Sequence, residues 1–234
     1  MIPTRYCRQI LPPEECNYVE KLIKKPDMDW KDGILTMIGG TADIKNKDYG
    51  SNTKKVFEGY HQDSYTIIRN FLDKDLEFQY ITCPKIYSAP IFSKIIEDGY
   101  YKSHLDNEFN GHYSTTLFLN DPSEYEGGEL QLLIDGEIVN YKLKKGWGVT
   151  YSTGLTHQVK KVTSGKRYAC VFWTTSHIND IIDRELYYEV SKAEESIQKI
   201  IPDKTVYDDL IQFQNDPRCR LSNVKKSIVR RNLK

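Results

Sequence analysis

The sequence predicts a mainly β chain with flanking helices, an α+β arrangement built on a double-sheet jelly roll. Two observations lead to this expectation. From about residue 88, short stretches rich in β-branched and aromatic residues recur at regular intervals, separated by Gly, Pro, Asn and Asp. Helical patterns lie before and after that region. At 234 residues the chain is long enough for one domain with a substantial core.

The N-terminal part mixes strand and helix signals. Prolines open the first helical stretch, acidic residues occupy its first turn and lysines close it, as the helix dipole favours. A second helical stretch has Asp63 or Ser64 as its expected N-cap. The expected elements are a strand over 5–10, a helix over 11–25, loop and short strand over 32–53, and a helix over 63–76.

The central region reads as eight short strands. The turn signals between them include "EDG", "NDPSEYEGG", "KKG" and "TSGK". This number and spacing of strands is typical of a jelly roll of the cupin-like, double-stranded β-helix kind. The expected strands cover 91–96, 100–106, 114–120, 128–135, 137–143, 146–152, 157–162 and 167–175.

The chain ends in a further helical part. Apolar residues at helical spacing predict a helix over 180–201, and a basic tail follows over 225–234. We expect one structural domain overall, in three parts: N-terminal α/β elements that pack on the core, the jelly-roll core itself, and a C-terminal helical extension. These parts cover residues 1–87, 88–178 and 179–234.

Composition narrows the function classes. Lys+Arg and Asp+Glu are equal at 33 each, so no overall charge favours nucleic acid, and only the basic tail offers a weak possibility of such a partner. No apolar stretch suggests a signal peptide or a membrane helix. Five scattered cysteines without a CxxC pair indicate reduced thiols. We therefore expect a soluble, cytoplasmic protein with no membrane partner.

A histidine and a carboxylate two residues apart are the first candidates for chemistry. His104 and Asp106 lie in "GYYKSHLDNEF". On an extended strand, residues i and i+2 point to the same face, so the two side chains can converge on a metal or form an acid–base pair. His-x-Asp also occurs by chance on exposed strands, so the pair alone does not decide between these readings.

Two later residues complete a constellation. His157 follows Asp106 by fifty-one residues, a separation that lets a late strand of a jelly roll lie beside an early one. Two histidines and one carboxylate form the facial triad of non-haem Fe(II) oxygenases. Arg167, ten residues further on, would be costly to bury without an anion. Its planar fork matches a carboxylate, and the distal carboxylate of 2-oxoglutarate is the anion that fits an iron site.

These residues carry a resemblance to a known family. The segments "HLD", "TTLFLNDPSEYEGGEL" and "GVTYSTGLTHQVKKVTSGKRYACVFW" resemble those of the Fe(II)- and 2-oxoglutarate-dependent oxygenases. Within them the chain is most similar to the prolyl/lysyl-type (prolyl 4-hydroxylase-like) hydroxylases of bacteria and their viruses. The resemblance is clearest from about residue 90 to residue 180 and weakens on both sides.

The resemblance implies roles for individual residues and a set of cofactors. The cofactors are Fe(II), 2-oxoglutarate and O2, with ascorbate as the expected reductant. The glycine pair 127–128 matches a hairpin turn that leads into a core strand. The implied roles are iron ligation by His104, Asp106 and His157, binding of the 2-oxoglutarate C5 carboxylate by Arg167, and lining of the active site by Tyr101 and Trp173.

The sequence departs from the family pattern at two positions. Many relatives carry a tyrosine nine residues before the first metal histidine, where this chain has Ile95. Prolyl hydroxylases often have another tyrosine where this chain has Phe118, which we expect to line the site. The second hydrogen-bond donor to 2-oxoglutarate is therefore open, and Thr116, on the same strand face as Phe118, is the expected substitute.

The resemblance implies hydroxylation of an unactivated C–H bond, with a prolyl residue of a protein or peptide as the expected substrate. Three alternatives stay open. The same chemistry could act on lysyl residues, on free amino acids or on a small metabolite. A nucleic-acid demethylase of the same superfamily is less favoured, because no second arginine or dense basic groove follows Arg167. A cupin-like binding protein without catalysis is disfavoured by the intact triad.

Overall fold

The computed structural model describes residues 5–33, 53–106, 111–201 and 210–233. These residues form two compact units. The larger unit contains 5–33, 53–74, 87–106 and 111–174. The smaller contains 75–86, 175–201 and 210–233. The three-part division expected above remains a prediction.

The chain combines a large β-sheet with helices at its flanks. The first half contains β1 (Arg5–Gln9), α1 (Pro13–Ile23), β2 (Lys31–Asp32), β3 (Thr53–Gly59), α2 (Gln62–Leu72), α3 (Leu76–Thr82), β4 (Pro84–Tyr87), β5 (Ile91–His104) and β6 (Tyr113–Phe118). The second half contains the 3-10 turn η1 (Pro122–Glu124), β7 (Tyr125–Gly127), β8 (Leu130–Ile134), β9 (Glu137–Tyr141), β10 (Trp147–Ser152), β11 (His157–Val159), β12 (Val162–Ser176), α4 (Ile181–Ile200), α5 (Leu210–Asn215) and α6 (Pro217–Arg231).

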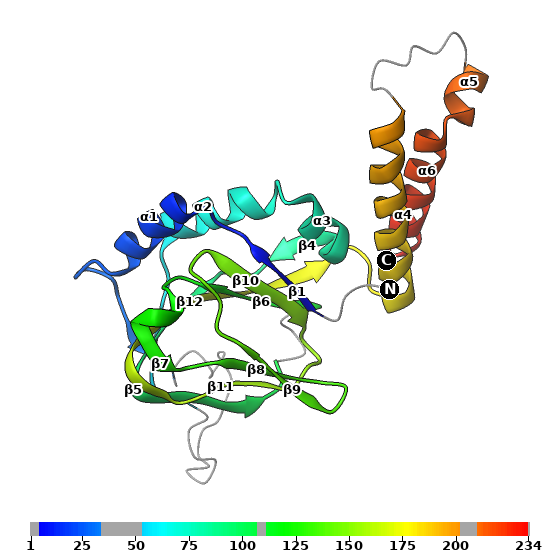
Figure 1. Ribbon diagram of the computed structural model, residues 1–234. Coiled ribbons are helices and arrows are strands. Elements are labelled where there is room, and N and C mark those ends of the chain that lie inside the picture. The colour runs from blue at the N-terminus through cyan, green and yellow to red at the C-terminus, as the bar shows by residue number, and fades with distance from the viewer. Residues whose placement is uncertain (1–4, 34–52, 107–110, 202–209, 234) are drawn as a thin grey trace. The chain divides into compact units, whose positions relative to one another are not determined.

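The strands of the larger unit pair antiparallel in the order β1-β10-β6-β12-β5-β11-β8-β9, and β3 adds to β5. The sheet folds back on itself, so that β1, β10, β6 and β12 face β11, β8 and β9 across the interior (Figure 1). Helices α1 and α2 lie over the outside of the layer that contains β10 and β6 (Figure 1). The mainly β jelly-roll fold with flanking helices, expected from the sequence, is confirmed.

Apolar side chains from both layers meet in the interior. Strand alternation points every second residue inward, and these residues are apolar along β8 and β10. The buried cluster between the layers is Phe118, Leu130, Leu132, Ile134, Tyr141, Val149 and Tyr151. Polar residues that share this interior are therefore positioned by a rigid core.

Strand β5 differs from the expectation of two separate strands. Its fourteen residues run through the "EDG" stretch that was expected to be a turn. Asp98 absorbs the irregularity with a φ of 67°. Its carboxylate is held by Lys161, with Nζ 2.6 Å from Oδ1, and by Lys55, with Nζ 3.4 Å from Oδ2. The strand bends at Asp98 but does not end there. It therefore runs continuously from Ile91 to His104, which is its last residue.

The helices also differ from the sequence expectation in detail. The helix expected over 63–76 is divided, because α2 ends at Leu72 and α3 begins at Leu76. The N-cap of α2 is His61, whose Nδ1 accepts a hydrogen bond from the Ser64 backbone N–H at 3.3 Å, so the expected caps Asp63 and Ser64 are wrong.

The smaller unit is helical. The helix expected over 180–201 is confirmed as α4, and the first residues of the basic tail form the C-terminal part of α6. Cys83, Ile178 and Ile228 make its buried cluster. The tail's cations are partly paired within the unit, as in the 2.8 Å contact between Lys225 Nζ and Glu194 Oε2. No helix in the described ranges is both long enough and apolar enough to cross a membrane.

Candidate metal centre and its surroundings

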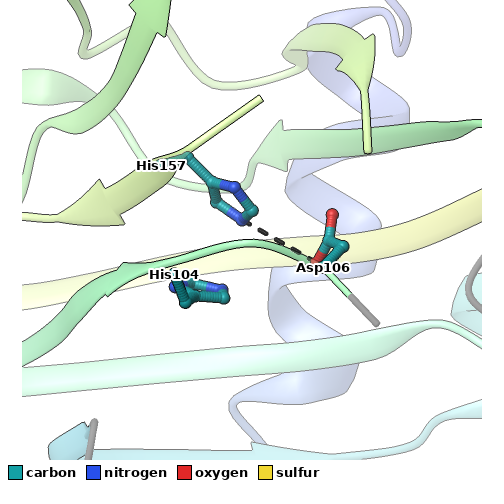
Figure 2. Close-up of side chains that lie close together, drawn as sticks. All are labelled: His104, Asp106 and His157. Atoms are coloured by element: carbon teal, nitrogen blue, oxygen red, sulfur yellow. Dashed lines mark ion pairs between the residues drawn. The ribbon is translucent and has the colours of Figure 1, made fainter. Parts of the chain in front are cut away.

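Two strands and the residues after one of them bring three candidate ligands together. His104 ends β5, Asp106 follows two residues later, and His157 begins β11. The antiparallel register of β5 and β11 places His157 directly opposite His104. The three side chains converge on one point (Figure 2).

The geometry of the cluster suits a single ion. One candidate ligand atom from each of the three residues lies within 4.8 Å of the others. His157 Nε2 lies 3.8 Å from Asp106 Oδ1 (Figure 2). The two imidazole rings are 4.2 Å apart between centroids and inclined at 51°.

Backbone hydrogen bonds orient both imidazoles. His104 Nδ1 lies 2.8 Å from the Lys102 carbonyl oxygen, and His157 Nδ1 lies 2.9 Å from that of Leu155. A carbonyl only accepts, so each Nδ1 carries the proton and donates it, which leaves the Nε2 lone pair to bind a metal. Burial and the neighbouring His157 lower the pKa of His104, which favours the neutral form that ligates.

The carboxylate of Asp106 fits the same role. Its Oδ2 is buried and has no hydrogen-bond partner among the residues that the structure describes. An unpaired buried carboxylate oxygen is costly, and a divalent cation would satisfy it. Two imidazole nitrogens and one carboxylate on one side of an ion form the donor set that Fe(II) takes in oxygenases, with open positions for other ligands.

Arg167 is the second buried charged group of this interior. It lies on β12 opposite Ile95, and only 2% of its surface is exposed. Its Nε and Nη2 have no hydrogen-bond partner within the described part of the chain. Its guanidinium lies over the Phe118 ring, 5.2 Å from the centroid. A buried guanidinium with N–H donors that have no partner in the described part of the chain is suited to an anion, and burial lowers the pKa of Arg167 against the opposing effects of Tyr125 and Tyr151.

Tyr151 lies between these two groups and was missed by sequence reasoning. Its ring meets that of His157 edge-on at 5.3 Å. Burial raises the pKa of its hydroxyl, Asp106 raises it further, and the nearby Ser114, Thr116 and Arg167 oppose this. The Tyr151 hydroxyl therefore interacts electrostatically with both Asp106, a candidate metal ligand, and Arg167, the candidate anion site. The signal in the sequence was the alternation of "WGVTYS", which turns Tyr151 inward six residues before His157.

The remaining expected residues all belong to this interior. The Tyr101 ring packs on His104 with centroids 4.3 Å apart. Trp173 lies on β12 opposite Ser114, and its Nε1 is buried without a hydrogen-bond partner among the described residues. Phe118 is fully buried beside Arg167, and Thr116 is 3% exposed. The Tyr151 hydroxyl lies close to that of Thr116. Either hydroxyl could therefore be the second hydrogen-bond donor to 2-oxoglutarate, the role expected of Thr116.

Comparisons with known proteins agree with this geometry. Residues 91–175 match the model of the 2OG-Fe(II) oxygenase superfamily. A PKHD-type hydroxylase of Prochlorococcus marinus (strain MIT 9215) is 30% identical over 198 residues, which cover 81% of this chain and 86% of that protein. A PKHD-type hydroxylase of Thermosynechococcus vestitus is 31% identical over 198 residues, 81% of this chain and 85% of that protein.

Solved structures show the same fold at low identity. A prolyl hydroxylase from Trichoplax adhaerens, in complex with a hypoxia inducible factor peptide fragment, is 12% identical with a TM-score of 0.55. The match covers 80% of this chain and 87% of that one. An oxidoreductase of the 2OG-Fe(II) oxygenase family from Burkholderia pseudomallei gives a TM-score of 0.54 at 13% identity, over 74% of this chain and 84% of that one. By its curated relatives the chain belongs to the 2OG-Fe(II) oxygenase superfamily, with PKHD-type hydroxylases among its relatives, and its fold resembles that of a prolyl hydroxylase.

Proposed function

We propose that this dioxygenase hydroxylates a prolyl residue in a protein or peptide. The observation that carries the chemistry is that three convergent candidate ligands share one interior with Arg167, whose Nε and Nη2 have no hydrogen-bond partner among the described residues. The prolyl assignment is supported by the relatives, which are PKHD-type hydroxylases, and by the peptide bound to the Trichoplax prolyl hydroxylase.

In this proposal His104 Nε2, His157 Nε2 and one Asp106 oxygen would hold Fe(II), which would supply the binding site for co-substrate and dioxygen. Bound Fe(II), with 2-oxoglutarate and O2, supplies the oxidising power to break an unactivated C–H bond while 2-oxoglutarate becomes succinate and CO2. The protein's contribution is to fix the ligands before the reaction begins. Ascorbate, as the reductant that keeps the iron in the Fe(II) form, belongs to the proposal.

Arg167 holds the far end of 2-oxoglutarate by a bidentate contact with its C5 carboxylate. Phe118 covers the guanidinium and keeps water away from that ion pair, which strengthens it. Tyr101 and Trp173 wall the side of the site where the substrate C–H bond must lie. A hydroxyl from Thr116 or Tyr151 supplies the second hydrogen bond to the co-substrate.

The substrate peptide is proposed to lie beside Trp173, framed by the segments 33–58 and 107–113. Residues 34–52 and 107–110 of these segments lie outside the described residues. A proline is suited to such a groove because its ring fixes φ in advance and lowers the cost of ordering the peptide. We also propose that the protein works in the cytoplasm, where its five free cysteines stay reduced.

Turnover of a peptide array tests the proposal. The protein is incubated with Fe(II), 2-oxoglutarate and ascorbate, and each peptide is analysed for a mass gain of one oxygen atom while succinate is measured in parallel. Hydroxylation of proline-containing peptides is the expected result. Turnover confined to free amino acids or nucleobases, in a panel that includes proline peptides, contradicts the prolyl assignment.

A further inference from the structure

A buried carboxylate that the iron chemistry does not use lies on β3. Glu58 is 7% exposed, while its neighbours Phe57 and Gly59 are only half-buried. The register places it opposite Ser93 of β5, and Ser93 opposite Ala169 of β12. Both of those residues are buried, so the Glu58 side chain points into the interior of the larger unit.

One oxygen of this carboxylate has no hydrogen-bond partner in the described part of the chain that would explain its burial. Glu58 Oε2 is buried and lacks a hydrogen bond to any of the residues described. Burial, with a smaller contribution from Asp32, raises the pKa of Glu58 to about 7. A buried polar group without a partner destabilises the fold, and such a group is retained where it meets a ligand.

Tyr101 relates Glu58 to the metal centre. Its ring packs on His104, it lies on β5, with which β3 pairs, and both Glu58 and Asp106 interact electrostatically with its hydroxyl. The hydroxyl therefore lies within electrostatic reach of both carboxylates. The groups that act on Arg167 are Tyr125 and Tyr151, so the anion site is a different region of the same interior.

The charges of the loaded site decide which ligand suits Glu58. A divalent metal and Arg167 together balance Asp106 and a doubly charged 2-oxoglutarate. An ionised Glu58 then leaves one uncompensated negative charge in a buried site. A neutral hydrogen-bond donor would pair with Glu58 Oε2 but would not compensate the negative charge. An ammonium group does both, through charge-assisted hydrogen bonds.

We propose that Glu58 binds a cationic nitrogen of the substrate, the ammonium group of a lysyl side chain beside the prolyl residue that is hydroxylated. This deepens the proposed function and rests on it. Glu58 is thus a specificity-determining residue of the peptide site. It favours lysine-bearing peptides over neutral peptides of the same shape.

Paired peptides test this without turnover. The probes are proline-containing peptides in which each flanking position carries either lysine or the uncharged norleucine. Binding to the protein loaded with Zn(II) and 2-oxoglutarate is measured by fluorescence anisotropy. At one position the lysine peptide should bind about tenfold tighter or better than its norleucine partner, as a hydrogen bond to a charged group predicts.

The variant Glu58→Gln should bring that lysine-to-norleucine ratio close to one, while the exposed control Glu97→Gln on β5 should keep it. A merely structural effect of Glu58→Gln would weaken both peptides of a pair equally and leave the ratio unchanged. The proposal is overturned by an unchanged ratio in Glu58→Gln, or by equal binding of both peptides at every position. Succinate formation by the Fe(II)-loaded wild type tests the oxygenase reaction separately, because the binding ratio does not depend on it.

Discussion

At the scale of single residues, two backbone carbonyls orient the two histidines for metal binding. The carbonyls of Lys102 and Leu155 fix both imidazoles with Nε2 inward, so the site is organised before an ion arrives. We expect alanine at His104, Asp106 or His157 to abolish Fe(II)-dependent succinate formation and to weaken binding of Mn(II) as a stand-in.

The fold should survive these substitutions. Without a bound metal, the three close polar groups are costly to bury, so removing one of them relieves a desolvation cost about as large as the interactions that are lost. Circular dichroism melting checks this. Asp135→Asn, at an exposed turn, is the matched control and should keep full activity. Near-wild-type succinate formation in any of the three alanine variants would show that the residue is not a ligand.

Arg167 should govern co-substrate binding. Its loss leaves the C5 carboxylate of 2-oxoglutarate in a buried site without a partner, and truncating one member of such a pair costs about 2–5 kcal/mol, or roughly 30-fold to several-thousand-fold in affinity. Arg167→Ala should therefore raise the KM for 2-oxoglutarate steeply while Mn(II) binding stays nearly unchanged. Arg167→Lys keeps the charge but loses the fork, and should fall between.

The exposed neighbour Lys166 provides the control, since Lys166→Ala removes a positive charge from the same strand without touching the interior. Titration of 2-oxoglutarate into each variant gives the result. An unaltered KM in Arg167→Ala would place the co-substrate anchor elsewhere.

Two hydroxyls compete as the second donor to 2-oxoglutarate, and one pair of variants separates them. Tyr151→Phe and Thr116→Val each remove one hydroxyl and nearly keep the side-chain shape. The donor's loss should raise the KM for 2-oxoglutarate by about tenfold, the cost of about 1–1.5 kcal/mol for one hydrogen bond. Tyr141→Phe is the control, because the Tyr141 hydroxyl is buried without a partner among the described residues. If both test variants had the same KM for 2-oxoglutarate as the wild type, neither hydroxyl would be the donor.

The cluster of three candidate metal ligands could be predicted from the sequence, whereas part of its surroundings could not. The His-x-Asp spacing and the later His157 are local signals with a known geometric meaning. Tyr151 and Glu58 acquire their positions only from strand pairing, which decides the inward face of each strand and which strands are neighbours. Nothing local marks Glu58, in "KKVFEGY", as buried.

At the scale of elements, the sequence predicts where most strands lie and errs where a strand continues through a turn signal. Both β5 and β12 do so, at Asp98 and Gly165, which have φ values of 67° and 77°. Turn-forming residues also suit bulges inside long strands, and only the pairing partners distinguish the two. Here Lys166 to Val171 pair with Ile96 to Ile91, so both strands remain in the sheet.

The β12 irregularity should be sensitive to a single methyl group. A Cβ on Gly165 would lie 2.3 Å from the Glu124 carbonyl oxygen and 2.9 Å from the Tyr125 Cα, and its positive φ disfavours any other residue. Gly165→Ala should cost about 1–3 kcal/mol of unfolding free energy, through backbone strain and overpacking. It should also raise the KM for 2-oxoglutarate, because Gly165 lies two residues before Arg167.

Gly136→Ala is a closely matched control. Its φ of 84° carries the same backbone penalty, yet nothing lies within 4 Å of the added Cβ. The difference between the two melting temperatures therefore isolates the steric term at Gly165. Equal melting temperatures would show that β12 can move away from the Glu124 carbonyl without loss.

At the scale of the whole molecule, the proposed ligands all bind one of the two compact units. The strands that carry His104, His157 and Arg167 belong to the larger unit, and α4 to α6 belong to the smaller. A ligand that binds only the native state at a hundred times its Kd adds about 2.7 kcal/mol of stability. Zn(II) with 2-oxoglutarate should therefore slow hydrogen exchange in β5, β6, β11 and β12, measured by mass spectrometry, and leave α4 and α6 unchanged if the units open separately. In His104→Ala the protection should disappear. Equal protection of α4 and α6 in the wild type would show instead that the two units unfold as one cooperative body.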